Sequence, residues 1–401
     1  MCNLLELNLP RLAARAPARI LVCGDADFGY TSALSRSLRA RAYDARIFAS
    51  AYEERTELLT RYPHAAATID ALARDDVEVR CGVDARAITS HYGADATFDR
   101  IVFNLPQSPP APKARNQIQR HRALLAAFCA SAAQALSARG EVWITLLAGQ
   151  GGTPLDPLKR AHGDTWQLQE NGAAAGLLVS AARALSDAEV EALAVAGYTS
   201  TGRRKEGLPL GKRRKQKGLV VHILRREDED ESGDGVLGVG PLEWTLDNSF
   251  WLRGLAGSGE TTSEVAAGAA DGAADGAADE DDGAPSAAEM LAVSRAALGA
   301  RAAHALTCAP RLLDAYTRPS DGRRARTYRF EYSSRSLALS RDRALALNTA
   351  VCDALGAHFF LEPRNEGALD ASRDDTLSTS SEYGPTKRPR DDRALANGED
   401  A

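Results

Sequence analysis

The stretch RILVCGDADFGYTSALSRSLRARAYDARIFASAYEE, residues 19–54, joins an apolar run, a tight turn, a helical pattern and a second apolar run ending in acids. This succession is typical of a nucleotide-binding βαβ unit. Its loop, Gly24-Asp25-Ala26-Asp27-Phe28, lacks the G-x-G-x-x-G spacing that holds a dinucleotide pyrophosphate. The stretch therefore predicts a parallel sheet with a ligand at its edge, and the other strand ends must indicate which ligand.

Apolar runs and helical patterns go on alternating over residues 19–225. We expect strands at 19–24, 44–51, 77–85, 98–106 and 141–149, and helices at 31–41, 55–73 with an interruption near Pro63, and 118–136 with Gly140 as its cap. Continuous apolar strands that alternate with helices predict an α/β fold, a doubly wound, Rossmann-like parallel sheet.

The C-terminal half follows a different order. Strands are expected at 241–254, 304–317, 324–334 and 357–364, and helices at 286–303 and 340–356. The order β-α-β-β-α-β predicts a ferredoxin-like α+β domain. Tyr328, Phe330 and Tyr332 alternate on one strand, which fits either base stacking or packing on the two helices; we favour packing.

Composition sets the expected domain boundaries. A GAAD repeat without large apolar residues cannot bury enough surface to offset its ordering entropy. The predicted division is an extension at 1–18, a Rossmann-like domain at 19–226, an acidic linker at 227–240, a ferredoxin-like domain at 241–365 with a disordered insertion at 255–285, and a disordered tail at 366–401.

The totals exclude several classes of protein. With 44% hydrophobic and 26% charged residues and no apolar run as long as a membrane span, the sequence predicts a globular protein and no membrane partner. Its 6 Cys and 7 His are dispersed, so we expect no metal site, and buried thiols in a reducing compartment.

Polar residues follow four of the predicted strands. Gly24-Asp25, Glu53 and Asp84 follow the first three, and Asn104 to Gln107 follow the fourth. Ligands of such sheets bind at these ends, and acids without lysines suit a nucleoside with little phosphate. S-adenosylmethionine has this character. The alternative is that the aspartates only cap the helices that follow.

Several motifs in order resemble the large-subunit rRNA uridine-N3 methyltransferases: GDADFGYTSAL, EERTELLTRYPHA, CGVDA, FDRIVFNLPQ and GEVWITLLAGQGGTP. LAGQGGTPLDPLKRAHGDTWQ and GYTSTGRR resemble the branch called ferredoxin-fold anticodon-binding domain-containing proteins. The C-terminal half resembles the anticodon-binding domain of phenylalanyl-tRNA synthetase β chains. The resemblance implies S-adenosylmethionine as cofactor, bound by Gly24, Asp25, Asp27, Phe28, Glu53 and Asp84.

Methylation at N3 of uridine requires loss of the imide proton, because the neutral nitrogen has no free lone pair. The resemblance implies a catalytic segment of Asn104, Pro106 and Gln107, in which Asn104 accepts the imide hydrogen bond and Pro106 stiffens the turn. The motif equally fits an ordinary strand-end turn. Asp99 precedes its strand and is expected at the opposite end, so it is not assigned as the base.

A basic segment, residues 203–226, has ten Lys/Arg and one acid, Glu206. Its centre could bind RNA phosphates in a salt-dependent way, or serve as a solvated loop or nuclear-import signal; the residues concerned are Lys212, Arg213, Arg214, Lys215 and Lys217.

Two functions follow. The first is an S-adenosylmethionine-dependent RNA methyltransferase, acting most simply on uridine N3 of rRNA, with a C-terminal RNA-binding domain. The alternative is a non-catalytic RNA- or tRNA-binding protein with a degenerate methyltransferase domain. Ala26 and Gln107, which depart from the family pattern, favour the alternative, whereas Gly24, Asp27, Asp84 and Asn104 favour the enzyme. Either function places the protein in the cytoplasm or nucleus, including the nucleolus.

Overall fold

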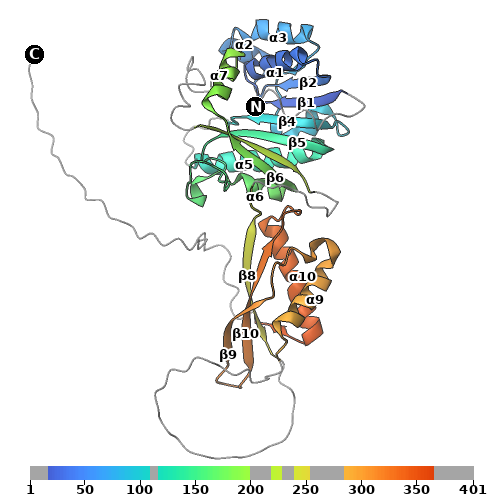
Figure 1. Ribbon diagram of the computed structural model, residues 1–401, viewed down its shortest axis with the longest axis vertical. Coiled ribbons are helices and arrows are strands. Elements are labelled where there is room, and N and C mark those ends of the chain that lie inside the picture. The colour runs from blue at the N-terminus through green and yellow to red at the C-terminus, as the bar shows by residue number, and fades with distance from the viewer. Residues whose placement is uncertain (1–16, 109–115, 199–217, 228–238, 253–283, 365–401) are drawn as a thin grey trace, which may run out of the picture. The chain divides into compact units, whose positions relative to one another are not determined.

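A computed structural model describes residues 17–108, 116–198, 218–227, 239–252 and 284–364 (Figure 1). The predicted disordered tail, the basic centre at 212–217 and most of the predicted insertion, the N-terminal extension and the acidic linker lie outside these residues. The predicted domain boundaries therefore stay predictions, and the two sheets are described separately.

The N-terminal domain is built on a seven-stranded sheet in the order β3-β2-β1-β4-β5-β7-β6. The strands are β1 Ala18–Cys23, β2 Ala45–Ser50, β3 Glu78–Arg80, β4 Phe98–Asn104, β5 Leu136–Leu147, β6 Leu177–Ala184 and β7 Leu219–Arg226. β1 to β5 are mutually parallel where they pair, whereas β7 runs antiparallel to both β5 and β6. The predicted Rossmann-like fold is confirmed, with an antiparallel strand at one side of the sheet.

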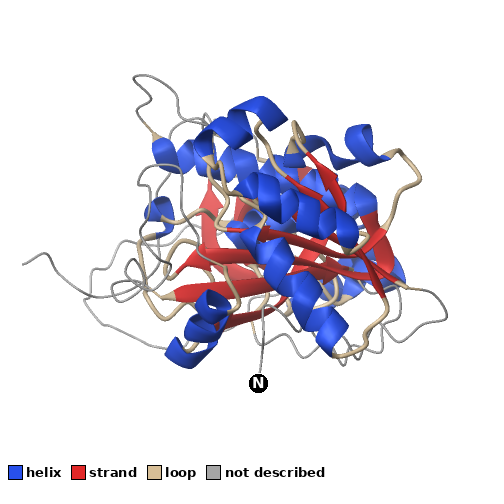
Figure 2. Ribbon diagram, turned by 90° about the horizontal axis from the view of Figure 1, so that it is seen from above, coloured by secondary structure: helices blue, strands red, loops and turns tan. Residues whose placement is uncertain are grey.

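Helices cover both faces of this sheet (Figures 1 and 2). They are α1 Gly29–Ala40, α2 Arg55–Arg61, α3 Ala65–Arg74, α4 Ile88–Tyr92, α5 Gln117–Ala135, α6 Leu168–Ala174 and α7 Asp187–Val195. Successive residues of β1 enter opposite cores: Ile20 and Val22 pack with the α1 and α3 side chains, and Leu21 and Cys23 pack with those of α5. A strand buried on both faces explains why this part of the sequence reads as a continuous apolar run.

Two expectations about this domain are wrong. Gly140 does not cap a helix, because α5 ends at Ala135 and β5 begins at the next residue, so that Gly140 lies inside the strand. A Cβ at Gly140 would lie 2.7 Å from Cδ1 of Leu136 and 3.0 Å from the carbonyl oxygen of Phe98, so the packing here leaves little room for a side chain. The sheet is also not wholly parallel, since β7 is inserted against β5 and β6.

The C-terminal domain has a four-stranded antiparallel sheet in the order β11-β8-β10-β9. Its elements are β8 Glu243–Trp251, α9 Ala287–Ala303, β9 Arg311–Thr317, β10 Arg324–Ser333, α10 Arg341–Phe359 and β11 Glu362–Pro363. This is the split βαβ order of a ferredoxin-like fold. The last strand is shorter than expected, because α10 continues to Phe359 and takes up the first residues predicted as strand.

One face of this small sheet is packed. Tyr328, Phe330 and Tyr332 of β10 are each at most 3% exposed and share a core with Val351 and Leu355 of α10. The packing interpretation is confirmed, and the base-stacking alternative for these three rings is wrong. Within the residues that the structure describes, none of the helices is both long and apolar enough to span a bilayer.

Candidate functional site

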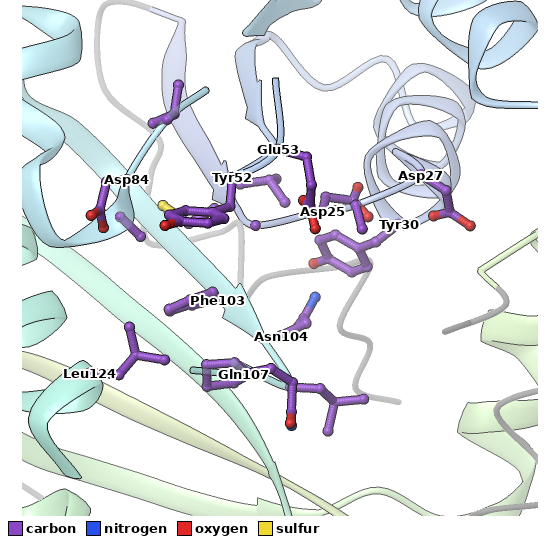
Figure 3. A pocket seen from close by; sticks show the side chains of 18 of the residues that line it. Asp25, Asp27, Tyr30, Tyr52, Glu53, Asp84, Phe103, Asn104, Gln107 and Leu124 are labelled. Carbon is purple, nitrogen blue, oxygen red and sulfur yellow. The ribbon is translucent and has the colours of Figure 1, made fainter. Parts of the chain in front are cut away.

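A pocket lies where β1, β2 and β4 end, and the loops that follow these strands form its walls (Figure 3). Its lining includes every predicted cofactor-binding or catalytic residue except one: Gly24, Asp25, Asp27, Glu53, Asp84, Asn104, Pro106 and Gln107. The carboxyl ends of parallel strands meet at one edge of a sheet, so residues up to 83 positions apart in sequence converge there.

Gly24 begins the first loop and lies close to another strand. Its φ is +64°, and a Cβ at this position would lie 2.8 Å from Cε2 of Phe103 on β4. A side chain here would therefore be strained and would push into the floor of the pocket. Ala26, two residues on, is not among the residues with positive φ, so the loop does not require a second glycine for its backbone.

Asp25 is buried at 8% exposure and is bound to the start of α1. Its Oδ2 accepts hydrogen bonds of 2.7 Å from both the backbone N and the Oγ1 of Thr31. Burial, together with the neighbouring Asp27, raises the pKa of Asp25 to about 7. The pocket thus contains a carboxyl group that can change charge near neutral pH.

Asp27 also caps α1, through a 3.0 Å hydrogen bond from the backbone N of Gly29 to Oδ1. Its other oxygen lies 3.4 Å from Nε2 of His64. Figure 3 shows this carboxylate turned away from Asp25 and Tyr30. Both aspartates therefore accept hydrogen bonds from the start of α1, as the capping interpretation expects. Both also line the pocket.

Phe28 is not part of the pocket lining, contrary to its assignment as a cofactor residue. It adopts a left-handed conformation with φ 58° at the residue before α1, and its ring is completely buried in the core that contains Ile20 and Tyr30. Its role in this structure is to anchor the loop to the core.

Glu53 and Asp84 stand at two other strand ends, and both carry arginine partners. Glu53 is 8% exposed and forms a 2.8 Å ion pair with Arg61. Asp84 accepts from the backbone and guanidinium of Arg86, the closest contact being 2.6 Å between Nη2 and Oδ2. The Arg86 hydrogen bond outweighs partial burial and holds the pKa of Asp84 below its ordinary value.

Asn104 ends β4 and faces the pocket with one half of its amide. Its Oδ1 accepts a 2.6 Å hydrogen bond from Oγ1 of Thr145, the residue opposite it on β5. Its Nδ2 is buried and has no hydrogen-bond partner. The expectation that Asn104 accepts the imide hydrogen bond does not fit this orientation, because the group left for a ligand is the donor.

The segment after Asn104 is held in an unusual conformation. Leu105 has φ +49°, which is strained for a branched side chain, and its backbone N donates a 2.8 Å hydrogen bond to the carbonyl oxygen of Thr145. Pro106 and Gln107 follow and line the pocket, Pro106 buried and Gln107 exposed. Asp99, at the other end of β4, accepts from the backbone N of Arg19 and from Ser137, as its position predicted.

The pocket also has an aromatic part that the sequence patterns did not predict, and it consists of Tyr30, Tyr52, Tyr62, Phe103 and Tyr198. Tyr52 could have been found, because it directly precedes Glu53 at a strand end. Tyr198 belongs to the motif GYTSTGRR, but nothing local places it in the site, which it reaches by packing edge-on against Tyr30, with 5.3 Å between ring centroids. Rings around acids fit a planar, positively charged or nucleoside-like ligand.

The N-terminal domain is similar in sequence to a known protein family. The family model described as BMT5-like, rRNA (uridine-N3-)-methyltransferase BTM5-like, matches residues 21–198. Over these residues the N-terminal domain is similar to the BMT5-like family. The match runs from β1 to the pocket residue Tyr198 and so includes the whole lining of the pocket.

Two curated relatives extend the comparison. Human ferredoxin-fold anticodon-binding domain-containing protein 1 is 32% identical over 212 residues, which is 53% of this chain and 31% of the relative. Its mouse homolog is 33% identical over 194 residues, 48% of this chain and 29% of the relative. The matched part thus spans about a third of the length of these relatives. The predicted resemblance to this branch is confirmed.

Solved structures match the fold distantly. TrmN from Thermus thermophilus is 16% identical, with 55% of this chain and 47% of that chain covered and a TM-score of 0.30.

Among the residues that the structure describes, no group of three or more His, Cys, Asp or Glu side chains could hold a metal ion.

Proposed function

We propose that the BMT5-like domain binds S-adenosylmethionine in the strand-end pocket and transfers its methyl group to N3 of a uridine in ribosomal RNA. The observation that carries this proposal is the convergence of Gly24, Asp25, Glu53, Asp84 and Asn104 on one aromatic-lined pocket inside the matched family segment. The family description supports the uridine-N3 position and the rRNA substrate.

The residues of the pocket fit this cofactor. Gly24 leaves backbone exposed where a Cβ would meet Phe103, Glu53 offers a carboxylate for the two ribose hydroxyls, and Asp84 offers one for an adenine amino group. Asp25 supplies negative charge for a cationic ligand once it is ionised. The lining contains one basic residue, Arg86, and this residue is engaged with Asp84, which fits a cofactor without phosphate.

When bound, S-adenosylmethionine supplies a methyl group activated by its sulfonium. The chain's own contribution is alignment: Asn104, Leu105 and Pro106 hold the target base in plane at the end of β4, and Phe103 forms the floor. The new N–C bond forms as the C–S bond breaks, and the imide proton of the uridine passes to water. Because water takes the proton, the transfer does not require any described side chain to act as a base.

The C-terminal domain is proposed to bind RNA, because the relatives are named for an anticodon-binding domain. Its contact with RNA would not use the buried rings of β10 and must involve other surfaces. We further propose that the protein acts in the nucleolus or cytoplasm, where ribosomal RNA is made or used.

The first test is calorimetric titration of the full chain with S-adenosylmethionine. Micromolar binding, about −8 kcal/mol, is expected. The chain offers a matched pair of variants, because Glu53 and Glu57 both form ion pairs with Arg61, at 2.8 and 3.0 Å, and only Glu53 lines the pocket. Glu53→Gln should weaken binding about tenfold, and Glu57→Gln should leave it unchanged.

The second test is transfer of a radiolabelled methyl group to large-subunit rRNA transcribed in vitro, followed by nucleoside analysis. A labelled N3-methyluridine peak is expected. Absence of binding, together with no thermal stabilisation by the cofactor, would contradict the proposal and favour the non-catalytic RNA-binding alternative.

A further inference from the structure

The site contains a buried hydrogen-bond donor that no protein group uses. Nδ2 of Asn104 is shielded from solvent and unpartnered, although it belongs to a residue of the pocket lining. Figure 3 shows this nitrogen pointing from the end of β4 toward Tyr30, into the pocket. Because an unmade hydrogen bond in a buried place is costly, such a donor is expected to meet an acceptor on the ligand.

A second residue decides which half of the amide faces the ligand. Oγ1 of Thr145 donates a 2.6 Å hydrogen bond to Oδ1 of Asn104, and Thr145 is 1% exposed. The carbonyl oxygen of Thr145 also accepts from the backbone N of Leu105, at 2.8 Å. Thr145 therefore fixes both the backbone after Asn104 and the rotation of its amide, without itself lining the pocket.

From this geometry we infer that Thr145 is a positioning residue that turns the amino group of Asn104 toward the pocket, so that the site selects bases carrying a carbonyl oxygen at C4, beside the target nitrogen. Uracil has such oxygens on both sides of N3. Cytosine shares the oxygen at C2 but has an amino group at C4, where it would meet another donor and leave both hydrogen bonds unmade. The inference rests on the proposed function, since it names the base recognised at that site.

The hydroxyl of Thr145 can be removed while its shape is kept. Thr145→Val is nearly isosteric and loses the bond to Asn104, whereas Thr145→Ser keeps the hydroxyl. In the valine variant the amide is free to turn either way, so the preference for uracil should disappear. In the serine variant it should persist. Neither change removes the backbone bond to Leu105.

The experiment measures binding rather than catalysis. Fluorescein-labelled tetrauridylate and tetracytidylate are titrated by anisotropy against the full-length protein saturated with S-adenosylhomocysteine. The wild type and Thr145→Ser should prefer the uridine oligomer about five- to tenfold, and Thr145→Val should bind the two within twofold. Asn104→Asp, which presents only acceptors, should shift the preference toward cytidine, and this variant keeps the test decisive if the valine variant does not fold.

The outcomes separate this inference from the proposed function. Equal binding of the two oligomers by the wild type, or a preference that Thr145→Val retains, would overturn the inference even if methyl transfer is observed. Loss of S-adenosylhomocysteine affinity in Thr145→Val and Asn104→Asp, with an unchanged base preference, would also overturn it, because the donor would then serve the cofactor. A preference that follows the hydroxyl would support the inference even if no methyl transfer occurs.

Discussion

The strand-end pocket and the packed face of the C-terminal sheet both place polar groups and aromatic rings close together, and they differ in how those groups are satisfied. In the C-terminal domain, Asn348 accepts from Tyr332 and Asn248 and donates back to Asn248, at 2.9 to 3.1 Å. In the pocket, Nδ2 of Asn104 has no partner and Asp25 has a raised pKa. The paired amides of Asn248 and Asn348 indicate packing, whereas an unsatisfied donor and a perturbed acid that line one pocket together indicate a ligand.

The largest expected effect is on the packed face. Phe330→Ala removes a completely buried ring and should lower the free energy of unfolding of the C-terminal domain by about 3–5 kcal/mol. Its neighbour Glu331 is exposed, so Glu331→Ala is the matched control and should change stability by less than about 1 kcal/mol. Urea denaturation checks both. Comparable losses in the two variants would mean that this face is not the core.

A pH-dependent effect should come next. Asp25 ionises at about 7 in the folded chain, against an ordinary value of 3.8, so the native state retains a proton that the unfolded chain loses between these values. Stability due to this group therefore falls as pH rises from about 4 to about 7. Asp25→Asn should be more stable than the wild type by about 1–3 kcal/mol at pH 8, and by almost nothing at pH 4.

Asp84 provides the opposite case for the same measurement. Its pKa is lowered by Arg86, so its ionised form stabilises the native state above the unfolded pKa. Asp84→Asn should therefore lose stability at neutral pH and recover as pH falls. Thermal unfolding of both variants across pH 4–8 tests the signs, and curves that move in the same direction would contradict the contrast drawn between these two carboxyl groups.

A smaller effect is expected on ligand binding when Gly24 is replaced. Gly24→Ala should weaken S-adenosylmethionine binding about tenfold, because its Cβ would press on Phe103 and fill the approach to the loop. Gly176→Ala controls for backbone strain, since Gly176 has a similar φ of +74° and nothing within 4 Å of its added Cβ. If both variants bind equally well in calorimetry, the close approach at Gly24 is irrelevant to the ligand.

The smallest effect belongs to the outer face of the C-terminal sheet. Arg329 and Asp247 form a pair of parallel 2.8 Å hydrogen bonds across β10 and β8, and their side chains are 34% and 40% exposed. Arg329→Ala should leave the stability of the domain almost unchanged, because an exposed ion pair contributes little. A marked loss of stability in urea denaturation would show that this face is covered in the folded protein.

The sequence predicted the sheet strands that are buried on both faces, because their apolar runs are continuous and each is followed by polar residues. It predicted the convergence of Gly24, Glu53, Asp84 and Asn104, since parallel strands end at one edge. It did not predict β6 or β7, because their antiparallel pairing is set by residues about 40 positions apart and has no short-range turn signal.

Three features of the site were beyond local reasoning. Phe28 reads as part of the loop motif, and only tertiary packing shows that its ring turns into the core. The rotation of the Asn104 amide depends on Thr145, which is distant in sequence and paired only through the sheet register. The arginine partners of Glu53 and Asp84 lie nearby in sequence, but the sequence alone does not predict which acid each arginine will pair with.

The position of β7 also constrains how the chain can be made. β6 pairs with β7, and β5 meets β6 only through β7. During synthesis, β1 to β6 therefore emerge before the strand that joins the last of them to the sheet, and β5 presents an open edge until residues 219–226 leave the ribosome. A chain truncated before Leu219 should accumulate in aggregates, whereas a chain truncated after Arg226 can complete its first sheet.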